Sequence, residues 1–154
     1  VDHNGPTALI LSRQTVLSVT DGSAVATGAG VVRDCDGKPT IILVGTGSEV
    51  GLCVNAASEL SKTGEKCRVV SMPSWDRFER LSKEQQREIF PKDVPVLSVE
   101  AGVTMGWERY ADQTIGINRF GTSAPGAIAL EKLGINLEAV LQASRSLIKD
   151  YKTQ

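Results

Sequence analysis

The feature that most constrains the fold is an alternation of short apolar runs with longer segments of helical periodicity. From residue 40 onward, the apolar runs are separated by stretches in which apolar side chains recur every three or four positions; the runs are TIILVG, CRVVSM, VPVLSVE and TIGI. Short apolar runs are typical of buried strands, and the recurrence is typical of helices that pack one face. Strands that alternate with helices predict a mostly parallel sheet covered on both faces.

One further apolar run, AGVVRD at residues 29–34, precedes this series and is followed by a segment that contains Asp36-Gly37. An Asp-Gly pair between strands is typical of a hairpin, because glycine readily adopts the positive φ of tight turns. The connection is also too short for a parallel crossover. We therefore predict an α/β domain of three layers (α/β/α) with a five-stranded mixed sheet, in which residues 29–34 are antiparallel. The four parallel strands are predicted at residues 40–45, 67–72, 96–100 and 114–118.

The helical segments carry their own boundary signals. Ser48 is a suitable N-cap for a helix over residues 48–63, which Gly64 can end. The polar segment at residues 74–90 predicts two short helices, and Asn136 is suited to cap the last helix of the chain. That last helix has one face for packing, formed by Leu137, Val140, Leu141, Ser144, Leu147, Ile148 and Tyr151.

The first thirty residues differ in composition from the rest. TALILS, at residues 7–12, predicts a short buried strand, and residues 14–30 are rich in Gly, Ser, Thr and Ala, as linkers are. The chain begins with Val1 and has methionine only at Met72 and Met105, so we expect it to be the later part of a longer protein. The expected division is the end of one domain at residues 1–14, a linker at 15–28 and a second domain at 29–154.

Charge and composition narrow the functional classes. The net charge is −1 without a basic block, and no apolar run approaches membrane-spanning length, so neither nucleic acid nor a membrane is an expected partner. Cys35, Cys53 and Cys67 are odd in number and form no C-x-x-C pair, which predicts unpaired thiols in a reducing compartment. The only histidine, His3, is near one end, so metal sites and histidine-assisted catalysis have little support.

One strand end carries a glycine-rich turn. Gly45, Thr46, Gly47 and Ser48 join a strand to a helix, and their main-chain N–H groups could hold an anion at the positive end of that helix. The turn matches neither G-x-G-x-x-G nor a Walker loop. A tight turn with Glu49 facing the helix dipole is therefore the favoured interpretation.

A second strand end carries Glu100, and Arg109 follows shortly after it in SVEAGVTMGWERY. A carboxylate at such a position is a candidate acid or base, but no second carboxylate or histidine has a spacing that completes a site. We therefore expect Glu100 and Arg109 to form ion pairs or anchor an interface. Trp75 and Trp107 are expected to pack in the core or at an interface.

Five blocks resemble transketolases in order and spacing: GPTALILSRQ, VGTGSEV, RVVSMPSWDRF, SVEAGVTMGWERY and GINRFGTSAPG. The resemblance extends from Gly5 to the last helix. The chain is similar to the C-terminal domain of a transketolase, preceded by the last strand of the middle, pyrimidine-binding domain. Most members read I-D-R-F-G where this chain has Asn118, so the charge of that aspartate is missing here.

The resemblance implies a homodimeric, cytoplasmic or organellar enzyme of the pentose phosphate and Calvin pathways. Such an enzyme moves a two-carbon ketol unit from a ketose phosphate to an aldose phosphate, using thiamine diphosphate and Mg²⁺ or Ca²⁺ held by the first and middle domains. No catalytic, cofactor-binding or metal-binding residue is then expected in this chain, and the chain alone is expected to be inactive. Arg13 matches the family's arginine that contacts the substrate phosphate, whereas Ser12 and Gln14 are expected to pack or cap.

Two other interpretations stay open. The first is the equivalent domain of another thiamine-diphosphate enzyme, such as deoxyxylulose-phosphate synthase or a 2-oxoacid dehydrogenase β subunit, although the SRQ and INRFG blocks favour transketolase. The second is a regulatory module that binds a nucleotide or another anion at the turn of residues 45–48.

Overall fold

The computed structural model describes residues 4–11 and 14–153, and its centre is a five-stranded sheet in the order β1-β3-β2-β4-β5. The strands are β1 (Gly30–Arg33), β2 (Ile41–Gly45), β3 (Cys67–Ser71), β4 (Val96–Val99) and β5 (Gln113–Ile115). β2 runs parallel to β3 and β4, and β4 runs parallel to β5, whereas β1 is antiparallel to β3. The predicted mixed sheet, with one antiparallel strand, is confirmed.

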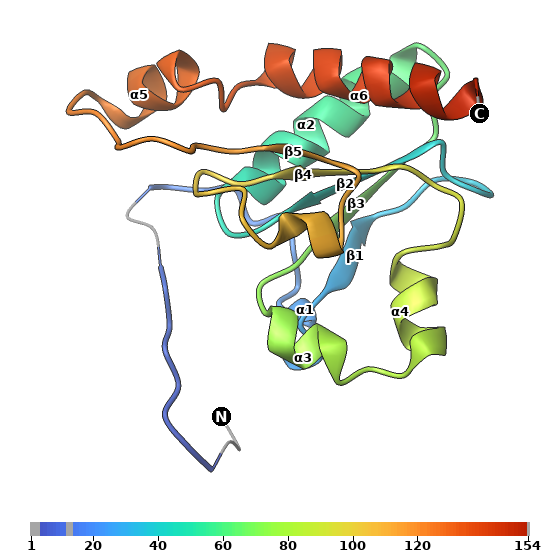
Figure 1. Ribbon diagram of the computed structural model, residues 1–154, viewed down its shortest axis with the longest axis horizontal. Coiled ribbons are helices and arrows are strands. Elements are labelled where there is room, and N and C mark those ends of the chain that lie inside the picture. Colours follow the sequence, from blue (N-terminus) through green and yellow to red (C-terminus); the bar gives the residue numbers. More distant parts are fainter. Residues whose placement is uncertain (1–3, 12–13, 154) are drawn as a thin grey trace.

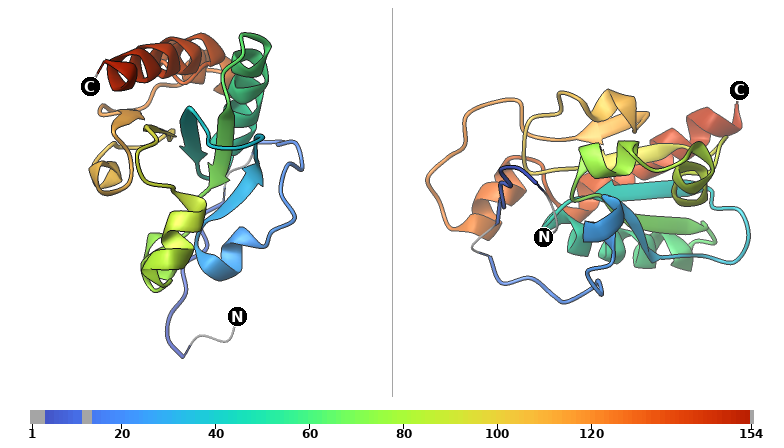
Figure 2. Two further views of the ribbon diagram at one scale, coloured as in Figure 1. Left: turned by 90° about the vertical axis from the view of Figure 1, so that its right-hand side faces the viewer. Right: turned by 90° about the horizontal axis from the view of Figure 1, so that it is seen from below.

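Helices cover both faces of this sheet (Figures 1 and 2). They are α1 (Ala24–Thr27), α2 (Glu49–Lys62), α3 (Trp75–Glu79), α4 (Lys83–Ile89), the 3₁₀ helix η1 (Trp107–Arg109) and α6 (Leu137–Lys152). α5 (Gly126–Lys132) lies to one side of the sheet and has no buried residue (Figure 1). Consecutive side chains of a strand point to opposite faces. Ile41 and Leu43 of β2 therefore pack toward α2 and α6, whereas Ile42 and Val44 pack toward α3 and η1. The three predicted layers follow from this alternation.

The predicted hairpin between residues 29–34 and 40–45 is wrong, because β3 lies between β1 and β2. Gly30 pairs with Ser71 and Val31 with Val70, so β1 is bonded to β3 alone. The Asp36-Gly37 turn does form, with φ 76° at Gly37. Seven residues can easily cross the roughly 10 Å of two strand spacings, so the short connection does not require adjacent strands.

A side-chain ion pair and a main-chain bond hold this connection beside the start of β3. The guanidinium of Arg68 donates to both carboxylate oxygens of Asp34, at 2.9 Å each, and the N–H of Thr40 donates to Lys66 O at 2.7 Å. These contacts tie both ends of the connecting segment to β3 and the residue before it. They reinforce the pairing of β1 with β3 at the end where β1 leaves the sheet.

The predicted buried strand at residues 7–12 is also not formed. Its described part, residues 7–11, has no regular secondary structure, and Leu9, Ile10 and Leu11 are 77%, 96% and 82% exposed. No strand in the described part of the chain pairs with it, and a strand without a neighbour leaves its N–H and C=O groups unpaired. In the segment expected to be a linker, the short helix α1 forms and buries Ala24.

The helix boundaries follow the sequence signals with one exception. Asn136 caps α6 by accepting a bond from the N–H of Ala139 at 2.9 Å, and Gly64, with φ 88°, follows the end of α2. Ser48 precedes α2 as predicted, but its hydroxyl donates to the Glu49 carboxylate at 2.7 Å instead of capping the helix. Of the helices in residues 4–11 and 14–153, none has the length and apolar character needed to cross a membrane.

Candidate functional site

The carboxyl ends of β2, β3 and β4 open onto a cleft of about 380 Å³. Parallel strands bring the loops after their carboxyl ends to one edge of the sheet, where α/β proteins commonly bind ligands. Thr46 lines the cleft after β2, residues 72–76 after β3 and Glu100 after β4, and Trp107 of η1 also lines it. The topology therefore gathers side chains that are far apart in the sequence.

Two carboxylates meet at this edge. Glu49, the first residue of α2, is only 5% exposed; its carboxylate accepts bonds from the Ser48 hydroxyl at 2.7 Å and from the N–H of Ala101 at 3.3 Å. Glu49 therefore lies beside the main chain that follows β4, close enough for its charge to act on Glu100. Burial, and secondarily the charge of Glu49, raises the pKa of Glu100 to about 7. The pKa of Glu100 therefore lies much closer to neutral pH than that of an ordinary carboxyl group.

The spacing of Glu49 and Glu100 in the sequence did not predict that these two residues lie close together. Glu49 and Glu100 follow β2 and β4, which are neighbours in the sheet although β3 separates them in the chain. The available signal was that Glu100 directly follows an apolar run and that Glu49 follows another after a short glycine-rich turn. Only the strand order shows that the two ends meet.

The turn of residues 45–48 is tightly packed against α2. A Cβ at Gly45 would lie 3.1 Å from Val50 N and 3.3 Å from Cys53 Sγ, so a larger residue there would press on the first turn of the helix. The Glu49 side chain lies at the helix N-terminus, where a negative charge is favourable. These contacts favour the tight-turn interpretation; anion binding at this turn stays a prediction, and an anion would face the carboxyl groups of Glu49 and Glu100.

Trp75 and Trp107 pack as expected for core aromatics. Trp107 is 2% exposed, and the two ring centroids are 5.2 Å apart with planes at 81°. Gly106, with φ 93°, allows this close approach, because a Cβ there would lie 2.7 Å from the Trp75 ring. The two tryptophans therefore form a rigid wall of the cleft.

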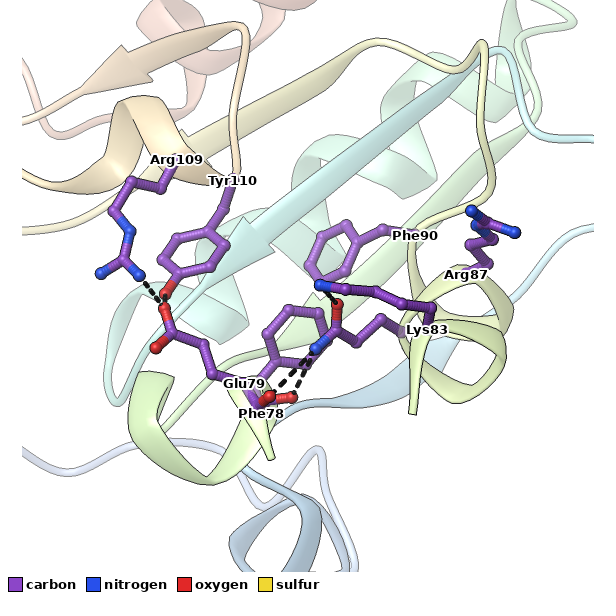
Figure 3. Close-up of a pocket in the computed structure, with 8 residues that line it drawn as sticks. Phe78, Glu79, Lys83, Arg87, Phe90, Arg109 and Tyr110 are labelled. Atoms are coloured by element: carbon purple, nitrogen blue, oxygen red, sulfur yellow. Dashed lines mark hydrogen bonds and ion pairs between the residues drawn. The ribbon is translucent and has the colours of Figure 1, made fainter. Parts of the chain in front are cut away.

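Arg109 forms an ion pair, as predicted, and its partner is Glu79 of α3 (Figure 3). The same carboxylate accepts a bond from the Tyr110 hydroxyl. Asn118, in the block that departs from I-D-R-F-G, accepts bonds from the N–H and hydroxyl of Thr104 at 2.9 and 3.1 Å. A neutral amide thus ties the two loops together where an aspartate would bring a charge.

Arg13, the predicted contact to a substrate phosphate, lies outside the described residues, as do Ser12 and His3. All three cysteines are free thiols, as predicted. Burial raises the pKa of Cys53 and of Cys67 to about 12, so neither thiol is activated at neutral pH.

The donor groups in the described part of the chain do not suit a divalent metal. Among residues 4–11 and 14–153, no group of three or more His, Cys, Asp and Glu side chains could hold one. Mg²⁺ and Ca²⁺ take six or more oxygen ligands, of which Glu49 and Glu100 would supply too few. The described residues therefore do not fit a site for a metal and the diphosphate that it binds.

The sequence of this chain is similar to the sequences of known proteins. The family model described as the transketolase-like TK C-terminal domain matches residues 28–136. A transketolase of Nostoc sp. is 42% identical over 152 residues, which cover 95% of this chain and 23% of the relative. A transketolase of Kluyveromyces lactis is 39% identical over 150 residues, covering 96% and 22%. The chain thus spans about a quarter of the length of these relatives.

The fold of this chain is also similar to that of solved structures. A transketolase from Leishmania mexicana superimposes with a TM-score of 0.83 at 38% identity, over 87% of this chain and 20% of that chain. A transketolase variant from Pichia stipitis gives 0.85 at 34% identity, over 92% and 21%. A P. stipitis transketolase in complex with sedoheptulose 7-phosphate gives 0.83 at 33% identity, over 90% and 20%.

Proposed function

This chain belongs to the transketolase-like C-terminal domain family, and we propose that it is the C-terminal domain of a transketolase. The observation that carries the proposal is the family match over residues 28–136. The whole enzyme transfers a two-carbon ketol unit from a ketose phosphate to an aldose phosphate. The P. stipitis complex with sedoheptulose 7-phosphate supports sugar phosphates as the substrate class.

In this proposal the chain has a structural role in the enzyme and supplies no catalytic residue. Thiamine diphosphate and its Mg²⁺ or Ca²⁺ are held by the other domains of a homodimer, and this proposal agrees with the described carboxylates, which do not make a metal site. The exposed side chains of Leu9, Ile10 and Leu11 pack in the preceding domain as part of its sheet. The three free thiols support a reducing compartment such as the cytoplasm.

Arg13 is the one residue of this chain that we propose contacts substrate. In the expected division of the chain it belongs to residues 1–14, the end of the preceding domain, just before the linker. A guanidinium stays charged at any working pH and offers a planar fork of donors to phosphate oxygens. Its role is to bind the phosphate of the sugar, away from the bonds that break.

A domain exchange tests this function. Residues 15–154 replace the corresponding part of the Nostoc sp. transketolase, and ketol transfer from xylulose 5-phosphate is assayed. We expect kcat/KM within about tenfold of the parent enzyme, because the parent's own cofactor site is intact. A correctly folded chimera that binds thiamine diphosphate but loses activity more than a hundredfold would contradict the proposal.

A further inference from the structure

Two of the three cysteines lie on neighbouring segments that run antiparallel. Cys35 follows β1, which is at the edge of the sheet, and Cys67 is the first residue of β3 (Figure 1). The ion pair between Asp34 and Arg68 continues the register of the two strands beyond the end of β1. The next step of that register places Cys35 opposite Cys67. Opposite residues of antiparallel strands have Cα atoms about 4.5–5.5 Å apart, a separation that a disulfide can span.

Contacts on both sides of this cysteine pair hold the two segments together. Just before Cys35, the carboxylate of Asp34 accepts two bonds from the Arg68 guanidinium, at 2.9 Å each. Just after it, Gly37 lies beside Lys66, whose Nζ would be 3.5 Å from a Cβ at this glycine. The main chain has no turn or bend at Asp34 or Cys35, so it stays extended up to this point. Cys35 is therefore held next to the start of β3.

The two thiols belong to the same face of the sheet. Cys67 packs in the apolar cluster that lies between the sheet and the helices α2 and α6. Arg33, two positions before Cys35, points to that face as well, because its guanidinium donates to the main-chain oxygen of Val54 and to the Ser58 hydroxyl of α2. Side chains two positions apart in an extended chain share a face. Cys35 is therefore directed to the side on which Cys67 lies.

The surroundings of Cys67 indicate that the two sulfur atoms interact. Burial raises the pKa of the Cys67 thiol to about 12, and the charges of Glu65 and Cys35 contribute to this shift. The Cys35 thiol is therefore close enough for its charge to act on Cys67. Each Sγ has only a long contact to a main-chain oxygen of its own segment, at 3.9 Å in both cases. Neither thiol is fixed by a strong hydrogen bond.

Cys35 is the thiol that a reagent in solution can reach, since it is partly exposed, whereas Cys67 is only 1% exposed. Burial and the charge of Asp34 raise the pKa of Cys35, and Asp36 adds to this effect. Arg68 and Lys66 act in the opposite direction. The thiolate is the reactive form of a cysteine, so Cys35 reacts slowly at neutral pH and faster in mildly alkaline solution.

We propose that Cys35 and Cys67 form a reversible disulfide, which ties the edge strand β1 to β3 under oxidising conditions. The Cys35 thiolate attacks a small disulfide such as glutathione disulfide, which gives a mixed disulfide and releases one glutathione thiolate. The Cys67 thiolate then attacks the Cys35 sulfur and releases the second. The two protein thiols lose two electrons and two protons, and glutathione disulfide is reduced to two glutathione molecules. In a reducing compartment, as proposed for this chain, excess small thiol reverses both steps.

Peptide mapping of the oxidised chain tests the pairing. The reduced 154-residue chain is incubated at low concentration with glutathione disulfide at about pH 8.5, and the remaining thiols are alkylated. Cleavage after glutamate, at Glu49, Glu59 and Glu65, places the three cysteines on separate peptides for mass spectrometry. We expect the peptides of Cys35 and Cys67 to be joined, with Cys53 alkylated, and dithiothreitol to restore three alkylatable thiols.

Oxidation of the unfolded chain is the matched comparison. Of the three possible disulfides, Cys35–Cys67 closes the longest loop, and longer loops cost more entropy to close. In concentrated urea the pairs that include Cys53 should therefore predominate, whereas the folded chain should give Cys35–Cys67 in at least tenfold excess over them. The same distribution of pairs in both conditions would overturn the proposal. So would a folded chain in which Cys35 stays in a mixed disulfide with glutathione and is never joined to Cys67.

Variants separate the two steps of the reaction. Folded Cys67→Ala should stop at the mixed disulfide between Cys35 and glutathione, and folded Cys35→Ser should form no disulfide within the chain. Cys53→Ala is the control, because Cys53 is buried in α2 and takes no part, and it should form the Cys35–Cys67 link at the parent's rate. Circular dichroism verifies that each variant is folded. A disulfide within folded Cys35→Ser, or loss of the link in folded Cys53→Ala, would contradict the assignment.

Discussion

Glu100 lies partly buried beside the Glu49 carboxylate, and its pKa is raised from 4.5 to about 7. The folded state therefore keeps a proton that the unfolded chain releases, and the stability this proton contributes is complete below pH 4.5. That contribution is lost as the pH rises through 7. At pH 8 the ionised Glu100 destabilises the fold because it is poorly solvated and close to another carboxyl group.

Replacing Glu100 with glutamine should remove this dependence. We expect Glu100→Gln to raise the free energy of unfolding at pH 8 by on the order of 2 kcal/mol and to change it little at pH 4. Urea denaturation between pH 4 and 8 measures the effect. Glu88→Gln, on the exposed side of α4, is the control and should leave the pH profile unchanged. A Glu100→Gln effect of equal size at pH 4 and pH 8 would disprove the proton linkage.

A separate prediction concerns Arg13, and it rests on the proposed function. In the full-length enzyme, Arg13→Ala should raise KM for sugar phosphates, with a loss of about 1.5–3 kcal/mol in kcat/KM, because one charged hydrogen-bond partner of the phosphate is removed. Thiamine diphosphate affinity should not change, and Arg13→Lys should retain part of the binding. Steady-state kinetics provides the measurement, and unchanged constants with sugar phosphates would exclude the phosphate contact.

At the scale of elements, the junction of β2 and α2 depends on a glycine. Gly45→Ala places a Cβ 3.1 Å from Val50 N, and should lower the free energy of unfolding by about 1–3 kcal/mol, since backbone of the helix must shift. Gly51→Ala, inside α2 with no atom within 4 Å of the new Cβ, should instead stabilise the fold by about 0.5–1 kcal/mol. Chemical denaturation compares the two, and equal destabilisation by both would refute the packing argument.

The elements that sequence predicted well are those specified locally. In α6, the buried Val140, Leu141, Ser144 and Ile148 all belong to the predicted face, and Asn136 caps it as its side chain allows. The predictions that failed concern which strands lie next to each other in the sheet. The Asp36-Gly37 turn is real, but its strands are separated by β3, and the run at residues 7–11 has no partner strand in the described chain.

The candidate site shows the same division. Each acidic residue could be placed at a strand end from its own surroundings, but the contact between Glu49 and Glu100 required the order of the strands. The same holds for Glu79, which meets Arg109 and Tyr110 across thirty residues of chain. Periodicity contains no information on such long-range pairs. The proposed function came from resemblance to a family. That resemblance did not predict these contacts.

At the scale of the whole molecule, the chain combines a well-packed sheet with exposed apolar side chains. Both faces of β2 are buried, whereas Ile10 and Phe120 are 96% exposed and Met105 is 76% exposed. Isolated exposed apolar residues are ordinary, but these lie on segments outside the sheet and its helices. The core of the domain is therefore formed by the sheet and its helices, and the exposed apolar side chains lie on loops and on the first residues.

Ketol transfer by the isolated chain tests most directly the claim that this domain contributes architecture and not chemistry. The purified chain is first shown to be folded by circular dichroism, and is then assayed with xylulose 5-phosphate and an aldose phosphate in the presence of thiamine diphosphate and Mg²⁺. We predict a folded protein with no turnover, because the described carboxylates do not form a metal–diphosphate site. Turnover by the verified 154-residue chain would contradict the account.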